Sequence, residues 1–240
     1  MGDTPPMVDP VLTFDGFPPE AFAWFEGLEA DNSRPWFTAH RETYETAVRG
    51  AFETMLDTLA DELGGSVKVF RQHRDLRFSA DKSPYKTRTY GVIFDRPDDG
   101  PTLYAQVSAT GLFAGTGYYL LASDQLARLR AAIADDATGP ALEAAVAAAD
   151  RAGVETYGET LKTAPRGYPR DHPRIRLLRH TSLVGGARIE PGARGIPRDA
   201  ALEHARATWA ACEPLNAWLA AHVGSSELPE EPRFGGRRRG

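Results

Sequence analysis

A short run of basic residues offers the clearest chemistry in this sequence. It reads RQHRDLRFSADKSPYK and spans Arg71 to Lys86. Each guanidinium carries five N–H donors whose geometry suits a phosphate or carboxylate, and a lysine adds a mobile point charge. Two aspartates cannot neutralise five neighbouring cations, so the run predicts a binding site for a small anion. The candidate ligand-binding residues here are Arg71, Arg74, Asp75, Arg77, Lys82 and Lys86, with Asp81 as the second local carboxylate.

Ion pairing inside the protein is the alternative use of these charges. A buried guanidinium without an acceptor is strongly destabilising, so arginines on both faces of an extended segment need partners. Carboxylates from elsewhere in this acidic chain could supply them and form a structural network. The sequence alone leaves both interpretations open.

Positive charge is concentrated in two segments. Residues 68–90 and residues 162–180 each carry a net charge of +5, whereas the whole chain carries −5, so all other residues together carry −15. This asymmetry predicts a localised positive field suited to an anionic ligand. We therefore expect the two segments to meet and line one pocket, with Arg166 and Asp171 contributing from the second.

Two residues are candidates for proton transfer at such a pocket, Tyr85 and His172. An imidazole titrates near neutral pH, which suits general acid–base work. Asp75 or Asp171 would orient a basic partner. The alternative for Asp171-His172-Pro173 is a capped turn that begins a short helix. These residues identify no reaction, so the sequence does not decide whether the protein is an enzyme.

Signatures of cofactor and metal sites are missing. Gly115-Thr116-Gly117 lacks the third glycine of a dinucleotide-binding loop, and the chain has no phosphate-binding loop of the Walker type. No two of the six histidines lie four residues apart as on one face of a helix. The sequence therefore predicts no metal site and names no cofactor.

The elements that must position these residues follow from apolar spacing. Helical spacing begins at Pro18-Pro19, resumes after Asn32-Ser33 and again before Gly64-Gly65, and it predicts that Trp36, Phe37 and Tyr44 are core residues. Alternation then predicts a sheet. The expected strands are 67–70, 90–94, 103–110, 111–121 and 182–189, and the expected later helices are 124–134, 140–151, a short one after Pro173, and 199–222.

Helices, strands and helices in that order predict an α+β fold with an antiparallel-rich central sheet flanked by N-terminal and C-terminal helices. We expect one domain over residues 13–224, a disordered N-terminus over 1–12 and a disordered basic tail over 225–240. A single cysteine, Cys212, excludes an internal disulfide and suits a reducing compartment. With no apolar run near the ~20 residues that cross a bilayer, the sequence predicts a cytoplasmic protein without a membrane partner.

Several motifs occur in an order that resembles the family called domain of unknown function 2461. The resemblance covers about residues 14–222, and its longest motif is the run from Arg74 to Thr87. It implies one domain in which both basic segments belong to the family pattern, and it implies no activity. The other motifs are Asn32–Phe37, Gly115–Gly117, Pro165–Tyr168, Asp171–Pro173 and Leu177–Arg179.

Three functional hypotheses follow. The first is a protein, possibly with enzymatic activity, that binds a small anionic ligand such as a phosphorylated metabolite. The second is a module for nucleic acid or a phosphoprotein, because Phe70, Phe78, Tyr85 and Tyr90 interleave with the basic groups. The third is a structural protein whose arginines form ion pairs. The net charge of −5 favours the first over the second.

Overall fold

Six strands hydrogen-bond into one antiparallel sheet in the order β2-β3-β4-β5-β7-β6. Lys68 pairs with Val92 at the β2–β3 edge, and Thr156 pairs with Gly185 at the β6–β7 edge. A separate pair joins β1 (Gly16–Phe17) to β8 (Ile196–Pro197). The strands of the sheet are β2 (Ser66–Val69), β3 (Arg88–Phe94), β4 (Leu103–Ser108), β5 (Gly111–Tyr118), β6 (Glu155–Tyr157) and β7 (Leu183–Ile189).

The computed structural model describes residues 13–75, 77, 81–97 and 100–228. By their contacts these residues form two compact units. The first unit comprises the described parts of Met1–Pro97, Tyr104–Phe113 and Arg188–Ala205. The second unit comprises those of Asp98–Leu103, Ala114–Ala187 and Arg206–Gly240.

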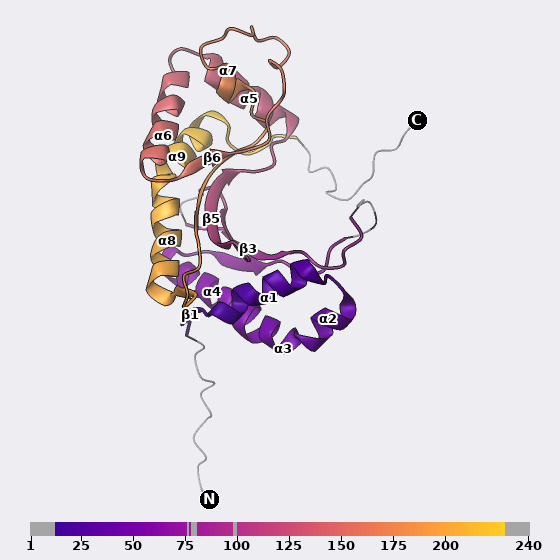
Figure 1. Cartoon of the computed structure of the whole chain (residues 1–240). Coiled ribbons are helices and arrows are strands. Elements are labelled where there is room, and N and C mark those ends of the chain that lie inside the picture. Colours follow the sequence, from indigo (N-terminus) through magenta and orange to yellow (C-terminus); the bar gives the residue numbers. More distant parts are fainter. Residues whose placement is uncertain (1–12, 76, 78–80, 98–99, 229–240) are drawn as a thin grey trace, which may run out of the picture. The chain divides into compact units, whose positions relative to one another are not determined.

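The helices of the first unit gather beside β3 (Figure 1). Pro19 opens the first of them, where its missing N–H is not needed. The Ser33 hydroxyl accepts a hydrogen bond from the Trp36 amide at 3.3 Å and caps the second. Gly64 ends the last at a φ of +72°, which glycine adopts without strain. These helices are α1 (Pro19–Ala30), α2 (Arg34–Ala39), α3 (Arg41–Thr43), the π-helical segment Tyr44–Gly50, and α4 (Ala51–Leu63).

Helix α4 covers one face of β3. Thr89, Gly91 and Ile93 are buried, while the residues between them are at least partly exposed. A side chain on Gly91 would meet Leu56 of α4, so glycine permits the close approach of helix and strand. Arg88 and Tyr90 therefore lie on the opposite face of the strand, because successive side chains alternate.

The second unit packs its helices around an apolar core. Leu129, Leu142, Leu178 and Leu219 each come from a different helix and are fully buried. The helices are α5 (Ser123–Ala134), α6 (Gly139–Arg151), α7 (Ile175–Leu178) and α9 (Glu213–His222), and α8 (Arg198–Ala211) contributes residues to both units. No helix in the described part of the chain has the length and apolar character needed to cross a membrane.

The predicted α+β class with an antiparallel-rich sheet is confirmed. The single closing helix predicted over 199–222 is wrong, since Cys212 separates α8 from α9 and Pro214 lies in the first turn of α9. Proline lacks the N–H that a continuous helix needs, so a new helix begins there.

The aromatic core prediction is confirmed for two of three residues. Phe37 and Tyr44 are buried, whereas Trp36 is only partly buried. The Trp36 ring lies over Gly27 and stacks at 4.1 Å on the exposed His40. It covers the edge of the core rather than filling it.

The predicted domain boundaries at 13 and 224 stay predictions. Residues 1–12 and 229–240 lie outside the described residues. The first residues of the predicted tail are described, and Ser226 and Glu227 both donate to the Asp124 carboxylate at 2.8 Å.

Candidate functional site

The residues between β2 and β3 build the candidate site. We call the described residues 70–75, 77 and 81–87 the arm. Its two sides run antiparallel, with the Phe70 amide donating to the Tyr90 carbonyl at 3.0 Å and the Arg74 amide donating to the Pro84 carbonyl at 2.9 Å. The Lys86 amide donates to the Gln72 carbonyl at 2.9 Å. The arm thus extends the β2–β3 pairing and carries its basic residues beyond the strands.

Gln72 anchors the arm from inside. Its side chain is 4% exposed, and its amide nitrogen donates to the Lys86 carbonyl. Its amide oxygen accepts from the Thr89 hydroxyl at 3.0 Å and the Tyr44 hydroxyl at 3.5 Å. Burial raises the pKa of Tyr44 to about 12, so this phenol stays protonated and can donate. Gln72 therefore holds the Lys86 backbone and the Thr89 side chain, which lie on either side of Thr87.

Asn32 holds the other side of the arm. Its side-chain amide donates to the Tyr85 carbonyl and accepts from the Tyr85 amide, both at 3.1 Å. The Tyr85 ring is 3% exposed and stacks on Phe37 at 4.1 Å. Tyr85 is therefore a packing residue that positions its neighbour Lys86, and it is not among the residues that line the pocket described next.

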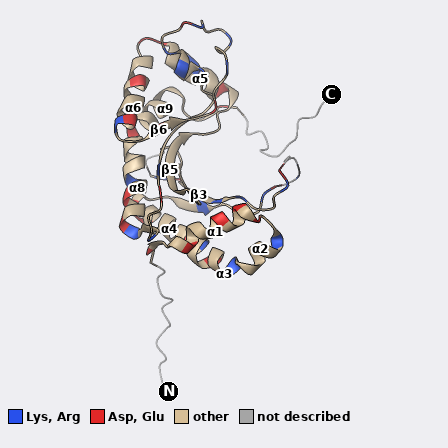
Figure 2. Ribbon diagram, viewed as in Figure 1, with Lys and Arg blue, Asp and Glu red and all other residues tan. Residues whose placement is uncertain are grey.

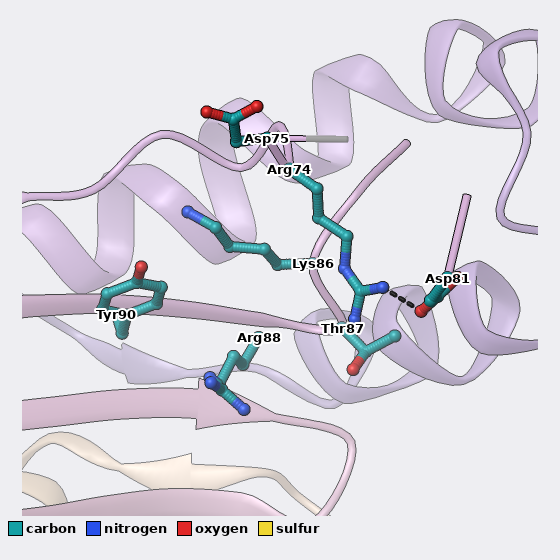
Figure 3. Close-up of a pocket in the computed structure, with 7 residues that line it drawn as sticks. All are labelled: Arg74, Asp75, Asp81, Lys86, Thr87, Arg88 and Tyr90. Atoms are coloured by element: carbon teal, nitrogen blue, oxygen red, sulfur yellow. Dashed lines mark hydrogen bonds and ion pairs between the residues drawn. The ribbon is translucent and has the colours of Figure 1, made fainter. Parts of the chain in front are cut away.

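A pocket of about 410 Å³ lies where the arm meets β3 (Figure 3). Three basic side chains, two carboxylates, one hydroxyl and one phenol line it. Figure 2 shows the Lys and Arg positions along β3 and the adjoining arm. The lining residues are Arg74, Asp75, Asp81, Lys86, Thr87, Arg88 and Tyr90.

Both carboxylates of the pocket already have partners. Asp81 accepts from the Ser83 amide at 2.9 Å, from the Ser83 hydroxyl, and from Arg74 (Figure 3). Asp75 accepts from Arg77 at 2.6 and 2.9 Å. The hydrogen bonds from Ser83, then from Arg74, lower the pKa of Asp81 to about 2. Those from Arg77 lower the pKa of Asp75 to about 2. Both groups are therefore ionised at neutral pH.

Lys86 and Arg88 differ from Arg74 and Arg77, each of which pairs with an aspartate. The Lys86 ammonium donates to the Arg71 carbonyl at 2.5 Å and lies 4.7 Å from the centre of the Tyr90 ring. The Arg88 guanidinium lies 5.8 Å from the same ring centre. Neither forms an ion pair with a carboxylate among the described residues. Positive charge in the pocket that remains unneutralised is thus centred on these two residues.

The second basic segment lies in the second unit, and two of its arginines donate to backbone carbonyls. Arg174 is 6% exposed, donates to the Ile133 carbonyl at 2.6 Å, and pairs with Asp136 at 2.5 Å. It thereby satisfies carbonyls at the end of α5 that have no partner within the helix. Arg179 donates to the Leu161 carbonyl at 2.5 Å.

His172 also contributes to local structure. Its Nδ1 accepts the Arg174 backbone N–H at 3.0 Å in the turn before α7, although α7 itself has no side-chain cap. Arg166 and Asp171 are exposed. Because the two basic segments belong to different units, their meeting in one pocket stays a prediction. The proton-transfer roles of Tyr85 and His172 stay predictions as well.

The structure brings together three of the predicted ligand-binding residues, Arg74, Asp75 and Lys86. Arg71, Arg77 and Lys82 belong to the arm but do not line the pocket. Sequence reasoning missed Thr87, Arg88 and Tyr90 as site residues. The signal that could have identified Arg88 and Tyr90 is the alternation of β3, which places positions 88 and 90 on one face. In the described part of the chain, no cluster of three or more His, Cys, Asp or Glu side chains could hold a metal ion.

Comparison with known proteins gives a family. No curated protein matches the chain. The profile of a family described as a conserved hypothetical protein matches residues 20–218, which include the arm, the pocket and both basic segments. The chain therefore belongs to the conserved hypothetical protein family DUF2461.

Proposed function

We propose that the pocket of the first unit binds a small anion that carries a phosphate or sulfate group. The observation that supports this most is the pair of cations, Lys86 and Arg88, which line one pocket without a carboxylate partner among the described residues. Arg74 would add a third donor, and the Thr87 hydroxyl a neutral one.

The arrangement suits an anion for an electrostatic reason. Lys86 and Arg88 both lie near the Tyr90 ring and line the same pocket, so two like charges share it. An anion between them would relieve their repulsion and accept charge-assisted hydrogen bonds, each of which contributes about 1.5–3 kcal/mol. The backbone around Thr87 is fixed by Gln72, so little ordering would be needed on binding.

The structural alternative accounts for only part of the site. The pairs Arg74–Asp81 and Arg77–Asp75 are ion pairs of the kind it predicts. It does not account for Lys86 and Arg88, which have no carboxylate partner among the described residues. We propose ligand binding without assigning a reaction, because the candidate acids and bases, Tyr85 and His172, do not line the pocket. We also place the protein in the cytoplasm, since its one cysteine, Cys212, is an unpaired, buried thiol.

Thermal unfolding in millimolar phosphate against chloride at equal ionic strength tests the proposal. Wild type should melt at higher temperature in phosphate, because a ligand of the folded state stabilises by RT ln(1 + [L]/Kd), about 2.7 kcal/mol at a hundredfold excess over Kd. Arg88→Ala should lose most of this gain. Arg41→Ala, an exposed arginine on α3, is the control and should keep it. A wild-type protein with no phosphate-specific gain would refute the proposal.

A further inference from the structure

Four aromatic side chains form a row across the first unit. We call Phe70, Tyr90, Tyr104 and Phe113 the aromatic row. Phe70 directly follows β2, and the others lie on β3, β4 and β5. The distances between successive ring centres are 4.8, 6.0 and 6.2 Å. The row therefore crosses four neighbouring strands, which at about 4.8 Å per strand spans roughly 14 Å.

The row lies on the face of the sheet that α4 does not cover. On β4, Leu103, Ala105 and Val107 are buried, while Tyr104 is half-buried. On β3 the face packed against α4 carries Gly91, and Tyr90 points the other way. All four residues of the row are half-buried, so each keeps part of its surface exposed on this side of the sheet.

Cations accompany the row from one end to the other. The Lys68 ammonium lies 5.3 Å from the Phe70 ring centre, and the Arg188 guanidinium from β7 lies 5.6 Å from that of Phe113. Lys86 and Arg88 lie over Tyr90 between them. None of these four cations forms an ion pair with a carboxylate in the described parts of the chain.

We infer that this face binds a single-stranded nucleic acid. Its bases would stack on the rings, and its phosphates would contact Lys68, Lys86, Arg88 and Arg188. The inference rests on the proposed anion pocket, which shares Lys86, Arg88 and Tyr90 with the row and would receive one of the phosphates.

The length of the row selects this ligand among polyanions. A phosphate ion or a short phosphorylated metabolite bound in the pocket would not contact Tyr104, Phe113 or Arg188, because these residues do not line the pocket. An acidic peptide would use the cations but not the rings. A duplex keeps its bases paired and stacked on each other, whereas a single strand exposes a planar face of each base. Stacking of such bases on aromatic side chains between basic groups is how sheet surfaces bind single strands.

Fluorescence anisotropy with labelled decathymidine tests the inference. Wild type should bind this strand about tenfold more tightly than an abasic strand with the same number of phosphates. Stacking of a single base on one aromatic ring is enough to produce a roughly tenfold difference in affinity. It should also prefer the single strand to a ten-base-pair duplex. The logarithm of the association constant should fall with the logarithm of salt concentration at a slope of about −2 to −3, as expected for three or four phosphate contacts.

Two variants probe the part of the row beyond the pocket. Tyr104→Leu should weaken binding of decathymidine about tenfold and leave binding of the abasic strand unchanged. Arg188→Ala removes an exposed side chain, so the fold should be retained, and it should reduce the salt slope by about 0.7. Arg41→Ala is again the control.

The outcomes separate this inference from the proposed function. Equal affinity for decathymidine and the abasic strand, or for decathymidine and an acidic peptide, would overturn the inference. Phosphate-specific stabilisation without decathymidine binding would also overturn it and leave the proposed function in place. Absence of both effects in wild type would refute both.

Discussion

A single buried amide organises the charged residues of the pocket. Gln72 contacts the backbone of Lys86 and the side chains of Thr89 and Tyr44, so one residue of the arm links it to β3 and to the helical layer. Lys86 and Arg88 follow on the same stretch of backbone and are directed into the pocket. The sequence gives Gln72 no special signal, because a glutamine between arginines is typical of an exposed segment.

Gln72→Leu should destabilise the protein by about 1–3 kcal/mol. The change leaves the Lys86 carbonyl and the Thr89 hydroxyl without their buried partner, and an unsatisfied buried polar group costs about that much. Denaturant unfolding measures the difference. The stabilisation by phosphate should fall in the same variant, because the backbone around Thr87 is no longer fixed. A loss below 0.5 kcal/mol would show that Gln72 does not anchor the arm.

Asp81→Asn should strengthen phosphate binding severalfold. The carboxylate of Asp81 lines the pocket and pairs with Arg74, so its removal frees a guanidinium and eliminates a negative charge that would repel the anion. Titration with phosphate at low ionic strength measures the affinity. Asp199→Asn is the matched control, since it breaks another exposed pair, with Arg198, outside the pocket. Weaker phosphate binding by Asp81→Asn would contradict this expectation. It would mean that the ion pair with Asp81 holds Arg74 in the position that binds the anion.

At the scale of elements, the sequence predicts which helices and strands exist better than where they begin. Alternation and helical spacing identify five of the six strands of the sheet and the helices α1, α5 and α6, but they miss the short strand β6. The start of β3 was expected at Tyr90, whereas the strand begins at Arg88. Because the strand begins two residues earlier than expected, Arg88 lies on the same face of β3 as Tyr90. Both side chains line the pocket. Alternation places these two positions on one face only if the strand is extended to Arg88, and apolar spacing does not extend it, because Arg88 is a charged residue on the partly exposed face.

The two basic segments also look alike in the sequence and differ in the structure. The first lines a pocket, and the second uses Arg174 to hold the end of α5. Composition cannot separate these uses, because an arginine that binds carbonyl oxygens and one that awaits a ligand have the same charge. The difference arises from long-range contacts across some forty residues of sequence.

Arg174→Met should destabilise the second unit without changing the anion site. The side chain is nearly buried and donates to the Ile133 and Ala134 carbonyls, which would lose their partner. We expect a loss of about 1–3 kcal/mol in denaturant unfolding. The phosphate-induced rise in melting temperature should be unchanged, because Arg174 is not among the residues that line the pocket. Loss of phosphate stabilisation would support a pocket shared between the two segments.

At the scale of the whole molecule, charge distribution separates the protein from general nucleic-acid binders. The chain carries −5 overall, so a long polyanion would be repelled over most of its surface. A short positive region on an acidic protein suits a ligand that contacts only that region. This holds both for a small anion in the pocket and for the few nucleotides that the aromatic row could accommodate.

The most direct measurement is the position of an anion in crystals of the protein soaked with selenate. Selenate has the charge and shape of sulfate, and its selenium atom is located by anomalous scattering. We expect a peak with oxygen atoms at hydrogen-bond distance from the Lys86 ammonium and the Arg88 guanidinium, and no such peak in Arg88→Ala. Selenate bound elsewhere while the pocket holds none would refute the proposed anion site.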